Sequence, residues 1–521
     1  MLRRIVALAA LAAVASSPLV ISPARAGRVQ LCSQTTGTSP CPLPGSKIAL
    51  GDTLEVSAAN VVTYFLASPG GAFADSGLFL VQPGGTFAMS GWAWPRVFAS
   101  AQIDNRGAWT NDAILQIEDD GTMWNRAGAT LVTSSDFTIY DDGRLVNDGL
   151  VENNLYLYTL IDPSNDPPGD PDNPTLDNRG TFLNHAGADL PLDGECFNSG
   201  TLVNEAGAFF SNTGLLTNTG TLVIAGPLTN TLYDAGRARI VNDGDFRVAA
   251  TGSVDRSTAV KPFGSYWQTS GRTVVNGPVK QTLVYVMGGA LEGGASLQGV
   301  VRVGDGAGST ATLSPGDSLD AIATLAITGS LGLGADARTV ADLAAGGLCD
   351  LVTATTRDTL RGELALRLST TSPPAVGDTL TILTAGTAIT GTFASVTVDG
   401  VPNAGAVAVL YEAKRVRVVV LALVGVETVA TLPEAARLAV RGGPAGRELA
   451  LDLPRAARVR LTLHDVLGRR VALVADGELA PGAHRFALEA RALPVGVLFA
   501  RASVSDAAGT TRLAARFASV R

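Results

Sequence analysis

The chain has 521 residues and a formal net charge of −8, and charged residues make up only 17% of it. With this net negative charge and few charged residues, the composition does not indicate the positively charged surface that binds nucleic acid. The 59 glycines suit turns and closely stacked backbone better than a helical enzyme. After the N-terminus, no stretch reaches the ~20 apolar residues that a membrane-spanning helix needs, so no transmembrane segment is predicted.

Residues 1–26 have the pattern of a secretory signal peptide. Two arginines open the segment, the apolar run 5–14 follows, and small residues precede a predicted cleavage site between Ala26 and Gly27. The alternative is an N-terminal membrane anchor, for which the apolar run is short. We therefore expect a protein exported across the inner membrane that is secreted or lies at the bacterial cell surface.

Residues 27–47 are predicted to form a loop-like N-terminal cap. Within it, Cys32 and Cys41 enclose a short loop rich in Ser, Thr and Pro. Because exported proteins fold in an oxidising compartment, a disulfide between these two cysteines is favoured over free thiols. Cys196 and Cys349 are too far apart in the sequence to argue for pairing and are expected to be small buried apolar residues.

A short phrase recurs along the next part of the chain: Asn or Asp, one residue, then Gly. It begins at Asn105, Asp119, Asp141, Asn178, Asn198, Asn218 and Asn242. Several of the intervals between phrases match the period of roughly 20 residues or slightly more that is typical of one coil of a stacked solenoid. The sequence therefore predicts an all-β fold with a right-handed parallel β-helix over residues 48–428, in which glycines adopt positive φ and asparagines stack as an amide ladder. A β-sandwich with Asn-x-Gly hairpins is the alternative.

The longest interval between two successive phrases, from Asp141 to Asn178, is interpreted as one coil of the solenoid plus an insertion. The insertion, residues 162–174, is rich in Pro and Asp, and it is expected to be a solvated surface loop because its spacing departs from that of an EF-hand. At ~22 residues per coil, residues 96–425 would form about 15 coils.

Several segments of the downstream region resemble the end of an autotransporter-type passenger β-helix, in which a Gly-Asp strand, an Asp-Leu-Val strand and a Gly-x-Phe strand recur in that order. The resemblance implies that coils continue to about residue 420. Its segments are Gly288–Gly299, Ser314–Ser318, Leu325–Gly329, Cys349–Val352 and Gly391–Phe393.

The composition changes near residue 430, which marks a second domain. Residues 430–521 contain 14 arginines, no lysine and 8 acidic residues. Alternating apolar runs predict a small β-sandwich of six short strands. These runs are 448–453, 458–464, 470–474, 484–488, 497–503 and 511–520.

The run from Leu461 to Val471, followed by Asp476-Gly477, resembles the immunoglobulin-like domain shared by flagellar hook-capping proteins and the C-terminal sorting domains of type IX secretion substrates. The resemblance implies that residues 429–521 are an immunoglobulin-like domain for sorting or attachment. Its partner would be the secretion machinery or a cell-surface component. His464, Leu488 and Leu498 depart from the aromatic residues that the family favours.

Carboxylates gather at two successive phrases of the repeat, at positions 118–120 and 141–142. One coil of separation would bring them to about 5 Å from each other on one flank. Like charges at that distance repel unless water screens them or a cation joins them. Solvated turns are therefore the favoured interpretation, and a Ca²⁺ site is the alternative, at Glu118, Asp119, Asp120, Asp141 and Asp142.

No catalytic or cofactor-binding residue is predicted, because no recognised motif surrounds the three histidines, His185, His464 and His484. The tryptophans are expected to be core or edge residues, with sugar stacking as the alternative; they include Trp92, Trp94, Trp109 and Trp124.

The expected function is structural or adhesive, with a glycan or protein ligand on the β-helix. A polysaccharide lyase or glycoside hydrolase on the same scaffold is the competing class. That class would require a cleft holding Asp119, Asp142 and an arginine.

Overall fold

The computed structural model is all-β, and the chain divides into two compact units, residues 1–422 and residues 423–521. Within the described ranges, the one helical segment is a 3-10 turn, Ala345–Gly347. The residues that the structure describes are 28–30, 53–56, 61–66, 72–74, 77–91, 96–97, 101–161, 174–231, 238–255, 264–318, 321–422, 435–443, 446–488, 493–494, 496–506 and 509–519.

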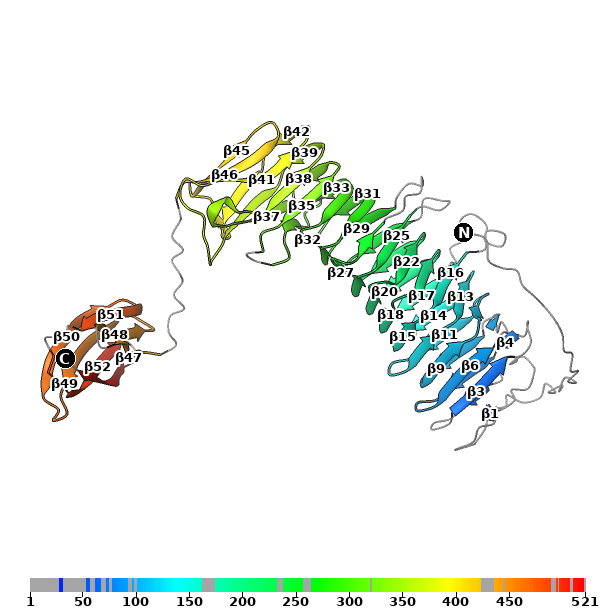
Figure 1. Ribbon diagram of the computed structural model, residues 1–521, viewed down its shortest axis with the longest axis horizontal. Coiled ribbons are helices and arrows are strands. Elements are labelled where there is room, and N and C mark those ends of the chain that lie inside the picture. The colour runs from blue at the N-terminus through cyan, green and yellow to red at the C-terminus, as the bar shows by residue number, and fades with distance from the viewer. Residues whose placement is uncertain are drawn as a thin grey trace, which may run out of the picture. The chain divides into compact units, whose positions relative to one another are not determined.

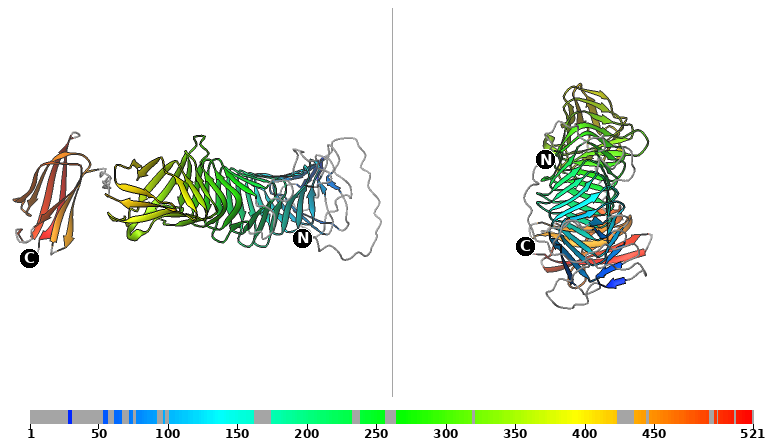
Figure 2. Two further views of the ribbon diagram at one scale, coloured as in Figure 1. Left: turned by 90° about the horizontal axis from the view of Figure 1, so that it is seen from above. Right: turned by 90° about the vertical axis from the view of Figure 1, so that its right-hand side faces the viewer.

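The first unit is a parallel β-solenoid of about 12 turns, which confirms the predicted β-helix. Over most of the solenoid each turn contributes three strands, and a strand pairs in parallel with the strand three places later in the chain, so that coils stack in chain order (Figures 1 and 2). The Asn178, Asn198 and Asn218 segments are neighbouring layers, since Asn178 pairs with Asn198 and Asn198 with Asn218.

The strands form three faces. The first contains β1 (Arg28–Gln30), β2 (Thr53–Val56), β5 (Leu78–Val81), β8 (Gln102–Asn105), β11 (Thr122–Asn125), β14 (Arg144–Asn147), β17 (Thr175–Asn178), β20 (Glu195–Asn198), β23 (Leu215–Asn218), β26 (Arg239–Asn242), β29 (Ser265–Gln268), β36 (Leu331–Leu333), β39 (Arg357–Leu360) and β42 (Ala388–Gly391). The second contains β3 (Val61–Leu66), β6 (Thr86–Gly91), β9 (Ala108–Asp112), β12 (Thr130–Thr133), β15 (Leu150–Asn153), β18 (Thr181–Asn184), β21 (Thr201–Asn204), β24 (Thr221–Ile224), β27 (Asp245–Val248), β30 (Arg272–Val275), β32 (Gly289–Gly293), β34 (Ala311–Pro315), β37 (Ala337–Leu343), β40 (Glu363–Leu368) and β43 (Ser395–Val398). The third contains β4 (Ala72–Ala74), β7 (Arg96–Val97), β10 (Leu115–Ile117), β13 (Asp136–Tyr140), β16 (Tyr156–Leu160), β19 (Asp189–Leu192), β22 (Phe209–Asn212), β25 (Pro227–Asn230), β28 (Ser253–Val254), β35 (Thr324–Thr328), β38 (Leu351–Ala354) and β41 (Thr379–Ala385).

Two longer strands, β31 (Val279–Val286) and β33 (Ser296–Val303), run from the third face into the first. The first half of β31 pairs with β28 and the second half with β29, and the register shifts between Lys280 and Leu283. One corner of the coil is therefore a bulge within a continuous strand in this part of the solenoid.

Short strands bury alternate residues inside the coil. In β20 and β21, for example, the second and fourth residues are buried and the first and third are partly exposed. Because side chains alternate along a strand, the inward positions stack into columns as coils repeat. One such column runs through Leu176, Cys196, Leu216 and Ile240, all of them fully buried.

Asparagines at the end of the first-face strands form the predicted amide ladder. The Asn198 side chain accepts a hydrogen bond from Asn178 Nδ2 at 2.6 Å and donates to Asn218 Oδ1 at 2.6 Å. Its second N–H donates to the carbonyl of Thr221 at 2.8 Å. The full ladder, with each Nδ2 donating to the next Oδ1, is Asn105, Asn125, Asn147, Asn178, Asn198, Asn218 and Asn242. Each amide of this ladder thus has partners although it lies out of water.

The recurring phrase occurs at two different corners of the coil. This corrects the sequence analysis, which treated all its copies as one repeated position. The Asn phrases lie between the first and second strands of a coil, whereas Asp119 and Asp141 lie between the third strand and the first strand of the next coil. Asn125 and Asn147, which were not among the phrases singled out, are the ladder residues of those two coils. The insertion therefore lengthens the coil that separates Asn147 from Asn178, since these two residues pair directly.

The glycines of the Asn phrases are needed for close stacking, and the positive-φ explanation is wrong for them. A Cβ on Gly200 would lie 2.1 Å from the carbonyl oxygen of Gly180 in the coil before it, and Gly220 meets Gly200 in the same way. The positive φ expected of these turns occurs instead at the next corner, for example at Gly187 with φ 89° and Gly207 with φ 87°.

The described C-terminal end of the solenoid is closed by antiparallel strands. β46 (Arg415–Val420) pairs antiparallel with β41 and with β45 (Val407–Tyr411), while β44 (Val401–Pro402) pairs with β43. A covered edge offers no free ladder to another chain. Because these residues form hairpins and several coils carry insertions, the solenoid has about 12 turns, fewer than the 15 estimated from a uniform repeat.

The second unit contains two antiparallel sheets that share one apolar core. One sheet has the order β47 (Arg437–Gly443), β48 (Gly446–Leu453), β51 (Gly482–Leu488), and the other β50 (Arg470–Leu479), β49 (Ala457–His464), β52 (Gly496–Asp506), β53 (Gly509–Ser519). The core includes Leu451, Leu461 and Ala500. The predicted β-sandwich is therefore present, and β47 is a strand that the sequence analysis missed.

Several predictions fall outside the described residues. These are the signal peptide with its Ala26–Gly27 cleavage site, the Cys32–Cys41 disulfide, Trp92, Trp94 and most of the insertion. Part of the segment expected to be a loop-like cap, Arg28–Gln30, forms β1 and pairs in parallel with β2.

Candidate functional site

The five predicted calcium-binding carboxylates lie on two turns of adjacent coils. Glu118, Asp119 and Asp120 follow β10, and Asp141 and Asp142 follow β13. The two strands pair directly, so the turns are neighbours, as the interval between the two phrases predicted. Three of the five adopt left-handed backbone, with φ of 48°, 65° and 44° at Asp119, Asp120 and Asp141, a conformation that Asp tolerates better than most residues.

Glu118 is the most shielded of these carboxylates, and it faces an arginine. Burial raises the pKa of Glu118, Arg96 opposes this with Nη1 3.4 Å from Oε1, and the charges of Asp119 and Asp141 raise it further. Among the residues that the structure describes, no three His, Cys, Asp or Glu side chains are grouped so that they could hold one metal ion. The calcium site remains a prediction for titration to test.

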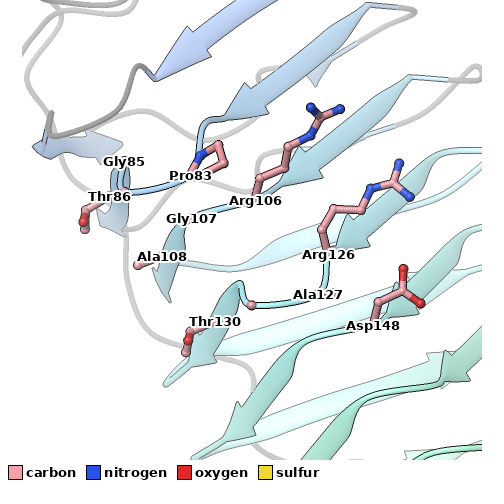
Figure 3. A pocket seen from close by; sticks show the side chains of 12 residues that line it. Pro83, Gly85, Thr86, Arg106, Gly107, Ala108, Arg126, Ala127, Thr130 and Asp148 are labelled. Atoms are coloured by element: carbon pink, nitrogen blue, oxygen red, sulfur yellow. The ribbon is translucent and has the colours of Figure 1, made fainter.

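A shallow groove of about 810 Å³ lies at another corner, where the first strand of a coil turns into the second (Figure 3). Glycine and alanine line much of it; a Cβ on Gly107 would lie 2.2 Å from the carbonyl oxygen of Gly85, whereas Gly128 has open space beside it and a φ of 81°. Arg106 and Arg126 project from successive turns in the same direction, with Asp148 on the next turn (Figure 3). Sequence analysis missed this groove, although each of the three follows a ladder asparagine.

One carboxylate forms ion pairs with both arginines of the groove. Asp104 Oδ2 accepts from Arg106 Nη2 at 2.7 Å, and Asp104 Oδ1 accepts from Arg126 Nε at 2.8 Å. Burial alone would raise the pKa of Asp104, but the hydrogen bonds from Arg106 and Arg126 outweigh it and lower that pKa. Arg126 also lies 4.3 Å above the ring of Trp124.

The groove lacks the pair of carboxyl groups that glycoside hydrolysis uses, one acidic and one basic. Asp104 is fixed as an ionised partner of two arginines, and Asp148 lies 4.0 Å from Arg179. Asp119 and Asp142, the carboxylates proposed for cleavage, are absent from the residues that line this groove.

The three histidines, Trp109 and Trp124 lie in the following surroundings. His185 lies between glutamates of the neighbouring coils, 3.9 Å from Glu152 and 3.2 Å from Glu205. Trp109 is buried, with its ring 4.5 Å from that of Phe87, whereas Trp124 faces outward. His464 Nδ1 lies 3.0 Å from the carbonyl of Gly468, and His484 Nε2 lies 2.7 Å from the carbonyl of Ala480.

The two cysteines of the described solenoid are free thiols in apolar surroundings. Cys196 is fully buried, and burial raises its pKa strongly. Cys349 is partly buried, its pKa is raised to about 11 chiefly by burial, and its Sγ lies 3.2 Å from the carbonyl of Thr381. Neither thiol is set up as a nucleophile, since both favour the protonated form.

Three aspartates are buried in the later coils, Asp342, Asp350 and Asp358, and two of them have strongly raised pKa values. Burial raises the pKa of Asp350 to about 6 and that of Asp358 to about 7. Asp350 accepts hydrogen bonds from the backbone N–H groups of Ala323 and Asp342, at 2.8 and 3.0 Å. Asp358 accepts one from Leu331 N at 3.3 Å, while its Oδ2 has no partner among the described residues. Because burial raises both pKa values, we expect these two carboxyl groups to make the stability of the solenoid depend on pH.

Comparison with known proteins adds no name to this fold. No protein-family model matches the chain, and no curated protein matches its sequence significantly. In the described part of the chain, no helix is both long enough and apolar enough to span a bilayer.

Proposed function

We propose that this chain is an exported bacterial protein of the cell surface or the extracellular space, in which the β-solenoid has a structural or adhesive role. The observation that carries the proposal is the regular outer surface. Equivalent outward side chains recur at each coil, about 4.8 Å apart, while the ladder asparagines inside the coil hydrogen-bond to one another. Such a surface suits repeated contact with a glycan or an extended protein.

The second unit would serve secretion or surface attachment, as the resemblance to immunoglobulin-like sorting domains implies. Its two antiparallel sheets support that resemblance. So does the turn after β49, where Asp465 Oδ1 accepts from the N–H groups of Leu467 and Arg469 at 2.9 and 3.0 Å. The turn exposes Val466 by 67% and Leu467 by 74%, which offers an apolar contact to a partner.

Deletion of residues 430–521 tests the sorting role. We expect the shortened protein to cross the inner membrane and accumulate in the periplasm, whereas the full chain reaches the surface. The double variant Val466→Ser and Leu467→Ser should show a milder form of the same defect, because it removes the exposed apolar contact and leaves the core intact. Unchanged export and surface attachment after the deletion would rule out a sorting role.

The adhesive role is tested by glycan-array and extracellular-matrix binding of the mature full chain, with release of reducing ends or unsaturated products measured in parallel. Binding without cleavage is the expected result. Cleavage that disappears in an Asp119→Asn and Asp142→Asn variant would instead support a lyase or glycoside hydrolase. Absence of binding to any surface component would overturn the adhesive proposal.

A further inference from the structure

An aromatic and cationic patch occupies the outward side of the first face where four coils stack. The register between β26, β29, β31 and β33 places two outward columns side by side. One column is Arg239, Ser265, Leu283 and Val300, and the other is Val241, Trp267, Tyr285 and Arg302. We call these eight residues the Trp267 patch.

The rings of Trp267 and Tyr285 form the centre of the patch. Their centroids are 5.3 Å apart, with an interplanar angle of 60°. Trp267 Nε1 donates to Ser265 Oγ at 3.0 Å, which fixes the indole on the surface of the sheet. Neither ring belongs to the core, because the inward residues of the same strands, Tyr266 and Val284, already fill the coil. The core therefore gives no reason for two large aromatic residues at these outward positions.

Arginines flank the two rings and keep their charge available. Arg239 lies with its guanidinium carbon 4.4 Å from the centre of the Trp267 ring, and Arg302 follows Tyr285 in the same column. Both are exposed, and neither makes an ion pair within the described part of the chain. Many other solenoid arginines face a carboxylate instead, as Arg179 does with Asp177 at 2.6 Å and Arg272 with Glu292 at 2.6 Å.

We propose that the Trp267 patch binds an acidic polysaccharide, one that carries carboxylate groups on its sugar rings. The apolar faces of the sugars would stack on Trp267 and Tyr285, and Arg239 and Arg302 would each take a carboxylate through paired N–H groups. This inference deepens the adhesive function proposed above and rests on it.

The dimensions of the patch fit an extended polymer better than a single ion. Arg239 and Arg302 are three coils apart, which corresponds to about 14 Å along the solenoid axis. The partly exposed Leu283 and Val300, the latter 39% exposed, continue the apolar surface beside the rings. The ligand would therefore lie along the solenoid axis. It would contact Arg239 and Arg302 with its carboxylates, and the aromatic rings between these two arginines with its sugar rings.

The groove at Arg106 and Arg126 provides an internal comparison. It also has an arginine over a tryptophan, with Arg126 4.3 Å from the Trp124 ring, and Trp124 is likewise an outward first-face residue. There, however, Asp104 binds both arginines and cancels part of their charge. An anionic ligand would have to displace or tolerate that carboxylate, so the Trp267 patch is the better anion site.

The test measures binding of oligogalacturonate, and of a neutral β-glucan oligomer of equal length, to the mature full chain by calorimetry at low and high salt. We expect oligogalacturonate to bind, with affinity that falls as salt rises, and the neutral oligomer to bind far more weakly. Trp267→Ala and the double variant Arg239→Gln with Arg302→Gln should each weaken oligogalacturonate binding by about fivefold or more. Trp124→Ala is the matched control and should leave the affinity unchanged.

Thermal unfolding and circular dichroism of each variant would verify that the solenoid is intact. Equal binding of the neutral oligomer, or unchanged affinity in a folded Trp267→Ala variant, would overturn the patch proposal. So would equal binding of poly-glutamate that is lost in the arginine variant and retained in Trp267→Ala, since that result would indicate an acidic peptide. If the array shows adhesion to another component, only the patch proposal fails; if nothing binds, the adhesive function fails with it.

Discussion

Replacement of Asn198 by Asp would test whether the amide ladder holds the coils together. The two side chains have nearly the same shape, but Asp at neutral pH has no hydrogen to donate. One carboxylate oxygen could still accept from Asn178, while the other would face the Asn218 Oδ1 and the Thr221 carbonyl, which now accept from Asn198 at 2.6 and 2.8 Å. If the Asn218 amide rotated, its N–H could donate to the new carboxylate, but its oxygen would then face the Asn242 Oδ1. The unpaired acceptors would therefore only move one coil further.

The expected loss follows from those two contacts. Each buried acceptor that loses its donor costs about 1–3 kcal/mol, and burial of the carboxylate adds to this, so Asn198→Asp should destabilise its coil by roughly 3–5 kcal/mol at pH 7. Asn198→Leu, which also leaves the Asn178 amide without its acceptor, should cost at least as much. Ser199→Ala is the control, because Ser199 is the adjacent residue in the sequence and is exposed.

The sign of the pH effect separates the charge from a general packing defect. Burial would raise the pKa of the new Asp in the folded chain, so the variant binds more protons folded than unfolded, and its stability falls as pH rises. Relative to the unmodified chain, Asn198→Asp should therefore recover part of its loss as pH falls toward 4, and Asn198→Leu should not. A solenoid can unfold in segments, so the assay is amide hydrogen exchange over β17–β24, supported by urea unfolding.

Two results would refute the ladder argument. The first is an Asn198→Asp variant whose exchange protection and urea midpoint match those of Ser199→Ala. The second is equal pH dependence in the Asp and Leu variants, which would mean that shape rather than hydrogen bonding governs this position.

Three other predictions concern stacking, pH and metal. Gly200→Ala should cost about 3 kcal/mol, because its Cβ would meet a backbone oxygen at 2.1 Å, whereas Gly332→Ala, with its nearest atom at 3.9 Å, should be close to neutral in the same unfolding assay. Asp358 keeps its proton in the folded chain up to about pH 7, so stability should fall between pH 4 and pH 7 by up to about 4 kcal/mol, and Asp358→Asn should flatten this slope in urea titrations; an unchanged slope would contradict the assignment. The calcium hypothesis predicts calorimetric binding that weakens at least about tenfold in an Asp119→Ala and Asp141→Ala variant, and absence of binding to the intact protein would remove the site.

The sequence predicted the parts of this fold that depend on periodic positions. Asn178, Asn198 and Asn218 are evenly spaced in the sequence, and the pairing of their strands follows from that spacing. Asn125 was missed because the glycine after it stands one place later than in the phrase, at Gly128. Asn147 was missed although Asn147-Asp148-Gly149 fits the phrase, and its place in the ladder is clear only from the strand pairing.

The candidate binding surface could not be predicted in the same way. Trp267 pairs with Val241 in the coil before it and with Tyr285 in the coil after it, but the two sequence intervals are unequal. Insertions and the bulged strand β31 change the coil length at this point, so no fixed period would align the columns. The register of these strands is therefore what brings Arg239 and Arg302 into one patch.

The direction of the amide ladder has a consequence for how such a chain can change in length. Each Nδ2 from Asn105 to Asn218 donates toward the C-terminal end, so every interior layer offers one acceptor below and one donor above. A duplicated one-coil module inserted in phase meets the same chemistry on both sides. The protein can therefore be lengthened or shortened by whole layers through simple gene duplication or loss, whereas an insertion that shifts the phase by a single position would turn the amides out of the interior.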